Sequence, residues 1–155
     1  MQTDLDDVDR QLLAALQANA RLTSAELAQQ VGLSQSPCWR RIRRMEEAGL
    51  IEGYHARLNR GGLGYGVVAF VSVSLDFQTE ARSREFVKAV RAIPQVVMFH
   101  GITGAADFLL MVLAQDLESY SELLQKKLHR LPGVRQVQTS FSIQEFKALG
   151  DLPIP

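Results

Sequence analysis

Apolar residues recur every three or four positions in the first fifty residues, which is the spacing of the buried face of a helix. The first run consists of Leu5, Val8, Leu12 and Leu16. A second helix is predicted to begin after Thr23, because Thr23 and Glu26 have the spacing of a capping box. A third is predicted to follow Ser34, with Pro37 in its first turn, where no backbone N–H is needed. Gly32 fits a left-handed C-cap between them, so the pattern predicts a helix-turn-helix.

The third predicted helix separates an apolar face from a basic one. Cys38, Ile42 and Met45 share the apolar face by helical spacing. The residues that point away from it are Ser36, Arg40, Arg43 and Arg44, with Arg41 at the border. Arginine donates bidentately to guanine edges and to phosphates, so this face has the chemistry of a major-groove reader. The alternative is a solvated helix face, since Glu46 and Glu47 neutralise much of its charge. The capped helix before it, and a short extended pair predicted over 51–58, favour DNA.

The segment 59–66 changes the pattern of the chain. It reads Asn-Arg-Gly-Gly-Leu-Gly-Tyr-Gly, which sustains neither a helix nor a central strand, and we interpret it as a hinge. The predicted organisation is therefore a helical domain over 1–58, the hinge over 59–66, a second domain over 67–147 and a tail over 148–155.

Strand-like alternation and helical periodicity follow one another after the hinge. The predicted strands are Val71–Phe77, Val96–Thr103, Phe108–Ala114 and Val137–Ile143. The predicted helices carry Phe86, Val90 and Ile93, and then Leu117, Tyr120, Leu124, Leu128 and Leu131, and each stops at a proline. The helix–proline–valine pattern that starts at Phe86 repeats from Leu124. The order β-α-β-β-α-β with this internal repeat predicts a ferredoxin-like domain, and the fold class α+β. The sheet face that the helices leave uncovered is apolar enough to predict self-association.

Composition narrows the classes of protein that fit. The 155 residues are 46% hydrophobic, with 17 basic and 17 acidic side chains, which excludes a histone-like or polyacidic protein but allows a local basic patch. The longest apolar run, Phe108–Ala114, is shorter than the roughly 20 residues of a membrane-spanning helix. The acidic start lacks the order of a signal peptide. One cysteine cannot form an internal disulfide, so we expect a reducing, cytoplasmic location.

A second candidate site lies at the turn between the two central predicted strands. Gly101 and Gly104 allow backbone N–H groups to approach a carboxylate, and Asp107 offers a partner for an ammonium group, the minimum chemistry for a zwitterion. The alternative, which the spacing alone favours, is a β-turn whose aspartate supports its own backbone. His100 and Thr103 flank the turn and are secondary candidates.

Catalysis finds little support in the sequence. His55, His100 and His129 lie in separate segments without metal-ligand spacing, and no nucleophile or phosphate-loop motif occurs. We therefore predict neither an enzyme nor a metal site. Two other functions stay open: an RNA-binding module, which wants aromatic and basic residues on the central strands, and a small ferredoxin-like enzyme.

Several segments, in order along the chain, resemble the leucine-responsive regulatory protein (Lrp/AsnC, feast/famine) family. Residues 32–51 resemble its recognition helix, 5–13 its opening helix and 53–59 the segment before its hinge. Residues 103–110 resemble its effector motif and 131–134 the entry to its last strand.

The resemblance implies a transcriptional regulator with a winged helix-turn-helix that binds double-stranded operator DNA. It implies an amino-acid effector rather than a cofactor, bound between subunits, and dimers that assemble further, often to octamers. The implied DNA-binding residues are Ser36, Pro37, Arg40, Arg41, Arg43 and Arg44. Those expected near bases are Ser36, Pro37, Arg40 and Arg44. Arg43 would lie near a phosphate, and Arg41 would contact a phosphate or form an internal ion pair. The implied effector-binding residues are His100, Gly101, Thr103, Gly104 and Asp107. Trp39 is expected to pack on the hairpin, with a DNA contact as the alternative, and Cys38 is expected to be buried. Ala105 and Ala106 depart from the family pattern, in which an acid often follows this glycine.

Overall fold

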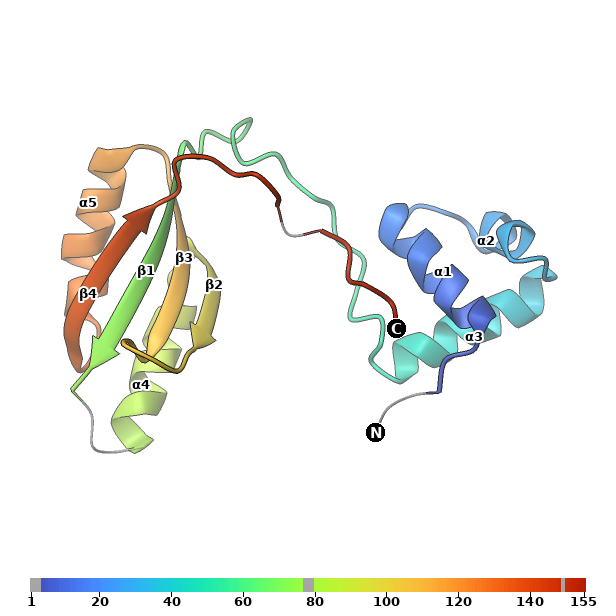
Figure 1. The fold of residues 1–155 in the computed structure, drawn as a ribbon, viewed down its shortest axis with the longest axis horizontal. Coiled ribbons are helices and arrows are strands. Elements are labelled where there is room, and N and C mark those ends of the chain that lie inside the picture. Colours follow the sequence, from blue (N-terminus) through green and yellow to red (C-terminus); the bar gives the residue numbers. More distant parts are fainter. Residues whose placement is uncertain (1–3, 77–79, 149) are drawn as a thin grey trace. The chain divides into compact units, whose positions relative to one another are not determined.

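The computed structural model describes residues 4–76, 80–148 and 150–155 (Figure 1). Its elements are α1 (Asp7–Ala18), α2 (Ser24–Gln30), α3 (Gln35–Glu47), β1 (Val67–Leu75), α4 (Glu80–Arg91), β2 (Val96–Gly101), β3 (Phe108–Ala114), α5 (Leu117–Lys126), the 3₁₀ helix η1 (Leu128–Arg130) and β4 (Val134–Phe141). They form two compact units. The helical unit comprises the chain up to Arg57 together with Lys147–Pro155, and the sheet unit comprises Leu58–Phe146.

Local capping fixes where the first helices begin. Asp6 caps α1 and forms a capping box with Asp9, and Thr23 does the same for α2 with Glu26. Each box satisfies N–H groups that have no partner inside the helix. Gly32 has φ of 68°, in the left-handed region, as its predicted C-cap role requires. Thr23 and Gly32 therefore mark the two ends of α2, and Gly32 begins the turn of the predicted helix-turn-helix.

The core of the helical unit is the apolar face that the sequence predicted. Leu12, Cys38 and Met45 have no exposed surface, and Leu27 has 2%. They bring α1, α2 and α3 together, because each helix contributes one apolar stripe to the same cluster. Burial also raises the pKa of the Cys38 thiol.

The extended pair predicted over 51–58 is absent. This segment contains neither helix nor strand, and Tyr54 instead donates its hydroxyl to Glu46 Oε1 at 2.8 Å. An isolated two-stranded pair is marginal in water, since it buries too little surface to offset its ordering. Burial and the Glu46 carboxylate raise the pKa of Tyr54 to about 12.

The sheet unit has the predicted order of elements. Its four strands are arranged β2-β3-β1-β4, and every neighbouring pair is antiparallel. Helices α4 and α5 cover one face of the sheet (Figure 1). This topology confirms the α+β, ferredoxin-like prediction.

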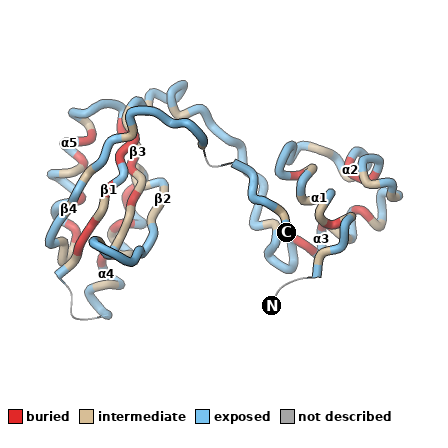
Figure 2. Tube along the Cα trace, viewed as in Figure 1, coloured by how far each residue is buried: buried red, intermediate tan, exposed pale blue. Residues whose placement is uncertain are grey.

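Burial in the sheet unit follows the alternation of the strands. Ala69, Val71 and Val73 on β1 are fully buried under the helices, as are Leu110 and Val112 on β3. Figure 2 shows this buried strip along the two central strands. The core thus lies between the helices and the middle of the sheet.

Several predicted boundaries in the sheet unit differ from the structure. β2 ends at Gly101 instead of Thr103, and β4 spans Val134–Phe141 instead of Val137–Ile143. β1 begins at Val67, four residues before the predicted Val71, and the predicted strand end at Phe77 lies outside the described residues. The helix expected to reach Leu131 ends as α5 at Lys126, and Leu128–Arg130 continue as a 3₁₀ turn. Tighter 3₁₀ turns are frequent at helix ends.

The glycine-rich segment 59–66 is a hydrogen-bonded turn. Asn59 Oδ1 accepts the Gly62 N–H at 3.0 Å, and the Arg60 carbonyl accepts the Tyr65 N–H at 2.9 Å. A side chain on Gly66 would approach the Gln115 carbonyl to 2.9 Å, so glycine is needed where the turn enters β1. No helix in the described ranges is long and apolar enough to cross a membrane.

Candidate DNA-binding and effector sites

The face of α3 opposite its core is open to solvent. Ser36, Arg40, Arg43 and Arg44 are exposed, while Pro37 and Arg41 are partly buried. The helix is fixed from behind, because Cys38 and Met45 are fully buried against the other helices. The structure therefore places all six predicted DNA-binding residues on one helix, with four of them exposed.

Asp9 joins two of these arginines to α1. Its side chain is 1% exposed, and its Oδ1 accepts from Arg41 Nη1 at 3.0 Å, while Oδ2 accepts from Arg44 Nη2. Arg41 Nη1 also donates to Asp6 Oδ2 at 2.6 Å. A buried carboxylate needs such partners, since an unpaired buried charge is costly. The internal ion pair that was one of the two roles considered for Arg41 is therefore present.

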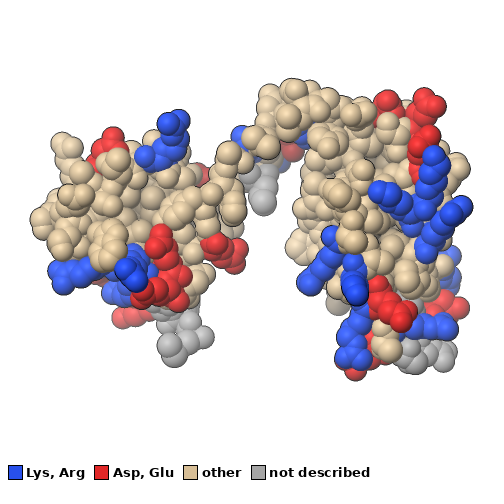
Figure 3. Space-filling model, turned by 180° about the vertical axis from the view of Figure 1, so that it is seen from behind, with Lys and Arg blue, Asp and Glu red and all other residues tan. Residues whose placement is uncertain are grey.

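The four charges of this cluster balance. The Asp9 backbone N–H and then the Arg41 guanidinium lower the pKa of Asp6, so its carboxylate stays ionised at neutral pH. Arg44 keeps 52% of its side chain exposed while it is bound to Asp9. Figure 3, a view from behind, shows basic and acidic side chains next to one another on the helical unit.

Arg40 and Arg43 differ in how they are held. Arg43 donates to Glu47 Oε1 at 2.8 Å, and its guanidinium lies 5.2 Å from the centre of the Trp39 ring. Trp39 is 48% exposed and has no hairpin to pack against, which corrects the expectation for it. Arg40 forms no ion pair or hydrogen bond with any described residue, so its guanidinium is available to a ligand.

The predicted effector residues come together at the end of the sheet. His100 and Gly101 end β2, and the turn that contains Thr103 and Gly104 leads to Asp107 just before β3. All five residues are exposed. Gly104 has φ of 121°, which an L side chain rarely adopts, so the turn requires glycine there.

Asp107 supports the neighbouring strand. Its Oδ2 accepts the Leu75 N–H at 2.8 Å, and its backbone N–H donates to the Val73 carbonyl at 3.0 Å. The spacing favoured an aspartate that supports the backbone of its own turn, whereas these bonds support the backbone of β1. The other oxygen, Oδ1, has no partner among the described residues, and the N–H groups of 103–106 donate to none of them. One acceptor and several donors at the same turn thus have no partner among the described residues.

Sequence reasoning missed two features of the helical unit. The Asp9 cluster had a usable signal, since acids three residues apart on the first helix match arginines three residues apart on the third. The return of the C-terminal tail to α1 had none, because contacts across 135 positions leave no local pattern.

Both units match known protein families. Residues 5–52 match the winged helix-turn-helix DNA-binding family, and residues 68–152 match the Lrp/AsnC ligand binding domain. The chain is 38% identical to the leucine-responsive regulatory protein of Rhizobium meliloti, over 95% of this chain and 94% of that protein. It is 40% identical to the Bkd operon transcriptional regulator of Pseudomonas aeruginosa, over 91% and 92%.

Solved structures agree with the sequence matches. A transcriptional regulator from Neisseria meningitidis, solved as an L-Met complex, superposes with a TM-score of 0.92 at 35% identity, over 97% of both chains. AsnC from E. coli superposes with a TM-score of 0.89 at 25% identity, over 97% of this chain and 99% of that one. The chain belongs to the Lrp/AsnC family of transcriptional regulators.

Proposed function

We propose that this regulator reads duplex DNA with the exposed face of α3 and responds to an amino acid bound at the turn between β2 and β3. The observation that carries the proposal is the unpaired, exposed Arg40 on a helix whose opposite face is fully buried. A rigid helix with a guanidinium projecting from it fits the major groove, where arginine donates to guanine O6 and N7.

The other residues of α3 would share the contact by chemistry. Ser36 and Pro37 lie in the first turn of the helix, near bases, as the N-terminal residues of recognition helices do. Arg43 is suited to a phosphate, since a stacked and salt-bridged guanidinium is held in one orientation. Arg44 would reach the DNA with the part of its side chain that Asp9 leaves exposed. Arg41 would contribute mainly by holding α3 against α1.

The effector site would bind both ends of a zwitterion. The N–H groups of 103–106, which donate to no described residue, would donate to a carboxylate, and Oδ1 of Asp107 would accept from an ammonium. The L-Met complex of the Neisseria meningitidis regulator supports an amino acid as the class of ligand. His100 and Thr103 would line the side-chain end of the site.

A second copy of the chain would cover the open face of the sheet. Phe70 is 38% exposed there and pairs in register with Met111, which pairs with Met98. An apolar face of this kind is typical of an isologous dimer interface. Dimers would place two α3 helices in successive major grooves about 34–36 Å apart, and further assembly to octamers would let DNA wrap.

The proposal is tested by selecting duplexes from a random library with the full-length protein and then titrating amino acids. We expect a selected duplex to bind more tightly than a shuffled one, and one or a few amino acids to change that affinity or the assembly state about 5- to 150-fold. Equal binding to both duplexes would contradict the DNA-reading role. An unchanged affinity and assembly state with all twenty amino acids would contradict the effector role.

A further inference from the structure

The C-terminal tail rejoins the helical unit after the sheet unit is complete. The chain leaves the helical unit at Arg57, forms the whole sheet unit, and returns at Lys147. The sheet unit is therefore inserted into the helical unit, and the two are joined by two covalent connections instead of one.

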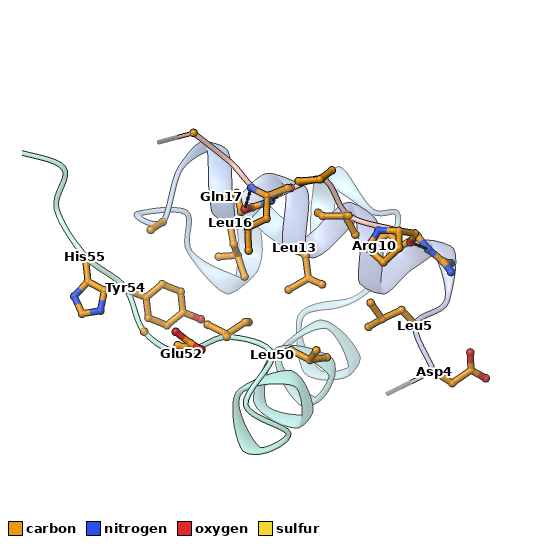
Figure 4. A pocket seen from close by; sticks show the side chains of 18 residues that line it. Asp4, Leu5, Arg10, Leu13, Leu16, Gln17, Leu50, Glu52, Tyr54 and His55 are labelled. Atoms are coloured by element: carbon orange, nitrogen blue, oxygen red, sulfur yellow. Dashed lines mark hydrogen bonds between the residues drawn. The ribbon is translucent and has the colours of Figure 1, made fainter. Parts of the chain in front are cut away.

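Side chains of α1 hold the tail by its backbone. Gln17 binds Leu152 through two hydrogen bonds, with Leu152 N–H donating to Oε1 at 2.7 Å and Nε2 donating to the Leu152 carbonyl at 3.0 Å. Arg10 Nε donates to the backbone oxygen of Pro155 at 2.6 Å. The bonded backbone groups are three residues apart, which matches the spacing of two turns on α1. Figure 4 shows both contacts on the same side of the helix.

The tail forms one wall of an apolar groove. The groove encloses about 1170 Å³ between α1, the segment 50–55 and the tail, and Leu13, Leu16 and Ile51 contribute to its walls (Figure 4). Ile154 is partly buried in it. An amide side chain that binds both the N–H and the carbonyl of one residue recognises an extended peptide in one register, as a neighbouring strand would.

The sequence of the tail reduces the entropic cost of docking. Pro153 and Pro155 fix their own φ, and each restricts the residue before it to extended conformations. The free tail is therefore already close to the bound shape, and a preorganised segment loses less entropy when it binds.

We propose that the groove beside α1 is a receptor for the chain's own C-terminal tail. This docked tail, which we call the clasp, restrains the helical unit, which carries the DNA-binding helix, relative to the sheet unit, which is the ligand-binding domain. With the tail docked, both ends of the ligand-binding unit are anchored to the DNA-binding unit. With the tail released, only the connection through 58–66 remains. The clasp thus offers a route from the end of β4 to α1 that does not pass through the glycine-rich segment.

Hydrogen exchange at the Leu152 amide tests whether the tail is docked. In the full-length protein we expect exchange to be slowed about tenfold or more relative to a free peptide, since the N–H is bonded to Gln17. Gln17→Ala should return it to the free rate, while Gln17→Glu, which keeps the acceptor and loses the donor, should give an intermediate rate. Gln11→Ala changes an exposed glutamine on the same helix and should leave exchange slow. Free exchange in the unmodified protein would overturn the proposal.

Fluorescence anisotropy of Trp39 tests the restraint itself. Trp39 is the only tryptophan of the chain and lies on α3, so its anisotropy decay reports how the DNA-binding unit tumbles. Gln17→Ala and a chain lacking residues 150–155 should each add a faster nanosecond component that the unmodified protein and Gln11→Ala lack. Identical decays in all four proteins would overturn the restraint. Neither measurement uses DNA or an amino acid, so the outcome is independent of the proposed function.

A complementation experiment decides whether the tail docks on its own chain or on a second copy. An isotope-labelled Gln17→Ala chain has an intact tail, and an unlabelled chain without residues 150–155 has an intact groove. If each tail docks on its own chain, the Leu152 amide of the labelled chain stays unprotected when the two are refolded together. Recovery of protection in the mixture would show docking on a second copy and would overturn the assignment to the chain's own groove.

Discussion

At the scale of single residues, the arginines of α3 are distinguished by what already binds them. Arg41 and Arg44 share the buried Asp9, and Arg43 is held by Glu47 and Trp39. Arg40 alone among them has no partner in the described part of the chain. A ligand that binds Arg40 displaces only water, whereas a ligand that binds the others competes with an existing ion pair. Arg40 is therefore the side chain on which sequence preference should depend most.

Arg40→Ala should weaken binding to a selected duplex by about 1–3 kcal/mol and relax the preference at one base position. Competition binding with single-base variants of the duplex measures both effects. Arg84→Ala removes an exposed arginine from the sheet unit and serves as the control. Unchanged affinity and selectivity in Arg40→Ala would remove this residue from the reading surface.

Asp9→Asn should destabilise the helical unit by about 1–3 kcal/mol, because the negative charge shared by the two guanidinium groups is lost and the amide accepts through one oxygen instead of two. The exposed parts of Arg41 and Arg44 regain water, which keeps the cost below that of stranding a fully buried charge. Urea unfolding gives the free energy. The matched Asp7→Asn variant removes an aspartate that is 95% exposed and should cost less than about 1 kcal/mol. Equal losses in the two variants would show that burial of Asp9 does not matter.

At the scale of elements, the helices of the DNA-binding unit are set by caps and apolar stripes that are local in sequence. This is why the Thr23–Glu26 capping box, the glycine C-cap and the buried face of α3 could be predicted from residue spacing, whereas the capping box of Asp6 and Asp9 was not predicted. The β-α-β-β-α-β order was predictable for the same reason. The prediction of an extended pair over 51–58 was wrong, because strand-like residues form a stable pair only when a third strand or a core supports them.

The capping box of α1 makes stability depend on pH. The pKa of Asp6 is lowered in the folded protein, so the unfolded chain binds this proton more readily. The stabilisation is present above the unfolded pKa near 3.8 and is lost as pH falls through the lower folded value. We expect the melting temperature to fall below about pH 4. Asn caps helices well but does not titrate, so Asp6→Asn should show a smaller fall, and an equal fall would contradict this role.

At the scale of the whole molecule, a helical unit and a sheet unit are joined by two covalent connections. The sequence predicted the exposed residues of α3 and the cluster at the effector turn, but it separated the segment 148–155 as a tail, which the structure joins to the helical unit. It did not predict the ion pairs around Asp9 or the docking of the tail, because each depends on which residues meet across the fold. The role of Asp107 shows the same limit, since the sequence placed it at the turn but the structure was needed to show its bond to β1.

Asp107→Asn should separate ligand binding from support of the sheet. The amide oxygen still accepts from the Leu75 N–H, while the charge that would hold an ammonium is gone. We expect the melting temperature without ligand to change little and the shift caused by the active amino acid to disappear. Asp76→Asn, which changes a nearby aspartate at the end of β1, is the control. A full ligand-induced shift in Asp107→Asn would place the effector elsewhere.

The most direct test of DNA reading by α3 is the affinity of the full-length protein for a selected and a shuffled duplex, measured across a series of salt concentrations. We expect tighter binding to the selected duplex. The logarithm of the binding constant should fall linearly with the logarithm of the salt concentration, with a slope of about 0.9 per phosphate contact. Arg40→Ala should reduce the difference in affinity between the two duplexes. The salt dependence of binding to the shuffled duplex should stay nearly the same. Failure to bind either duplex at low ionic strength, or an undiminished preference in Arg40→Ala, would contradict the account.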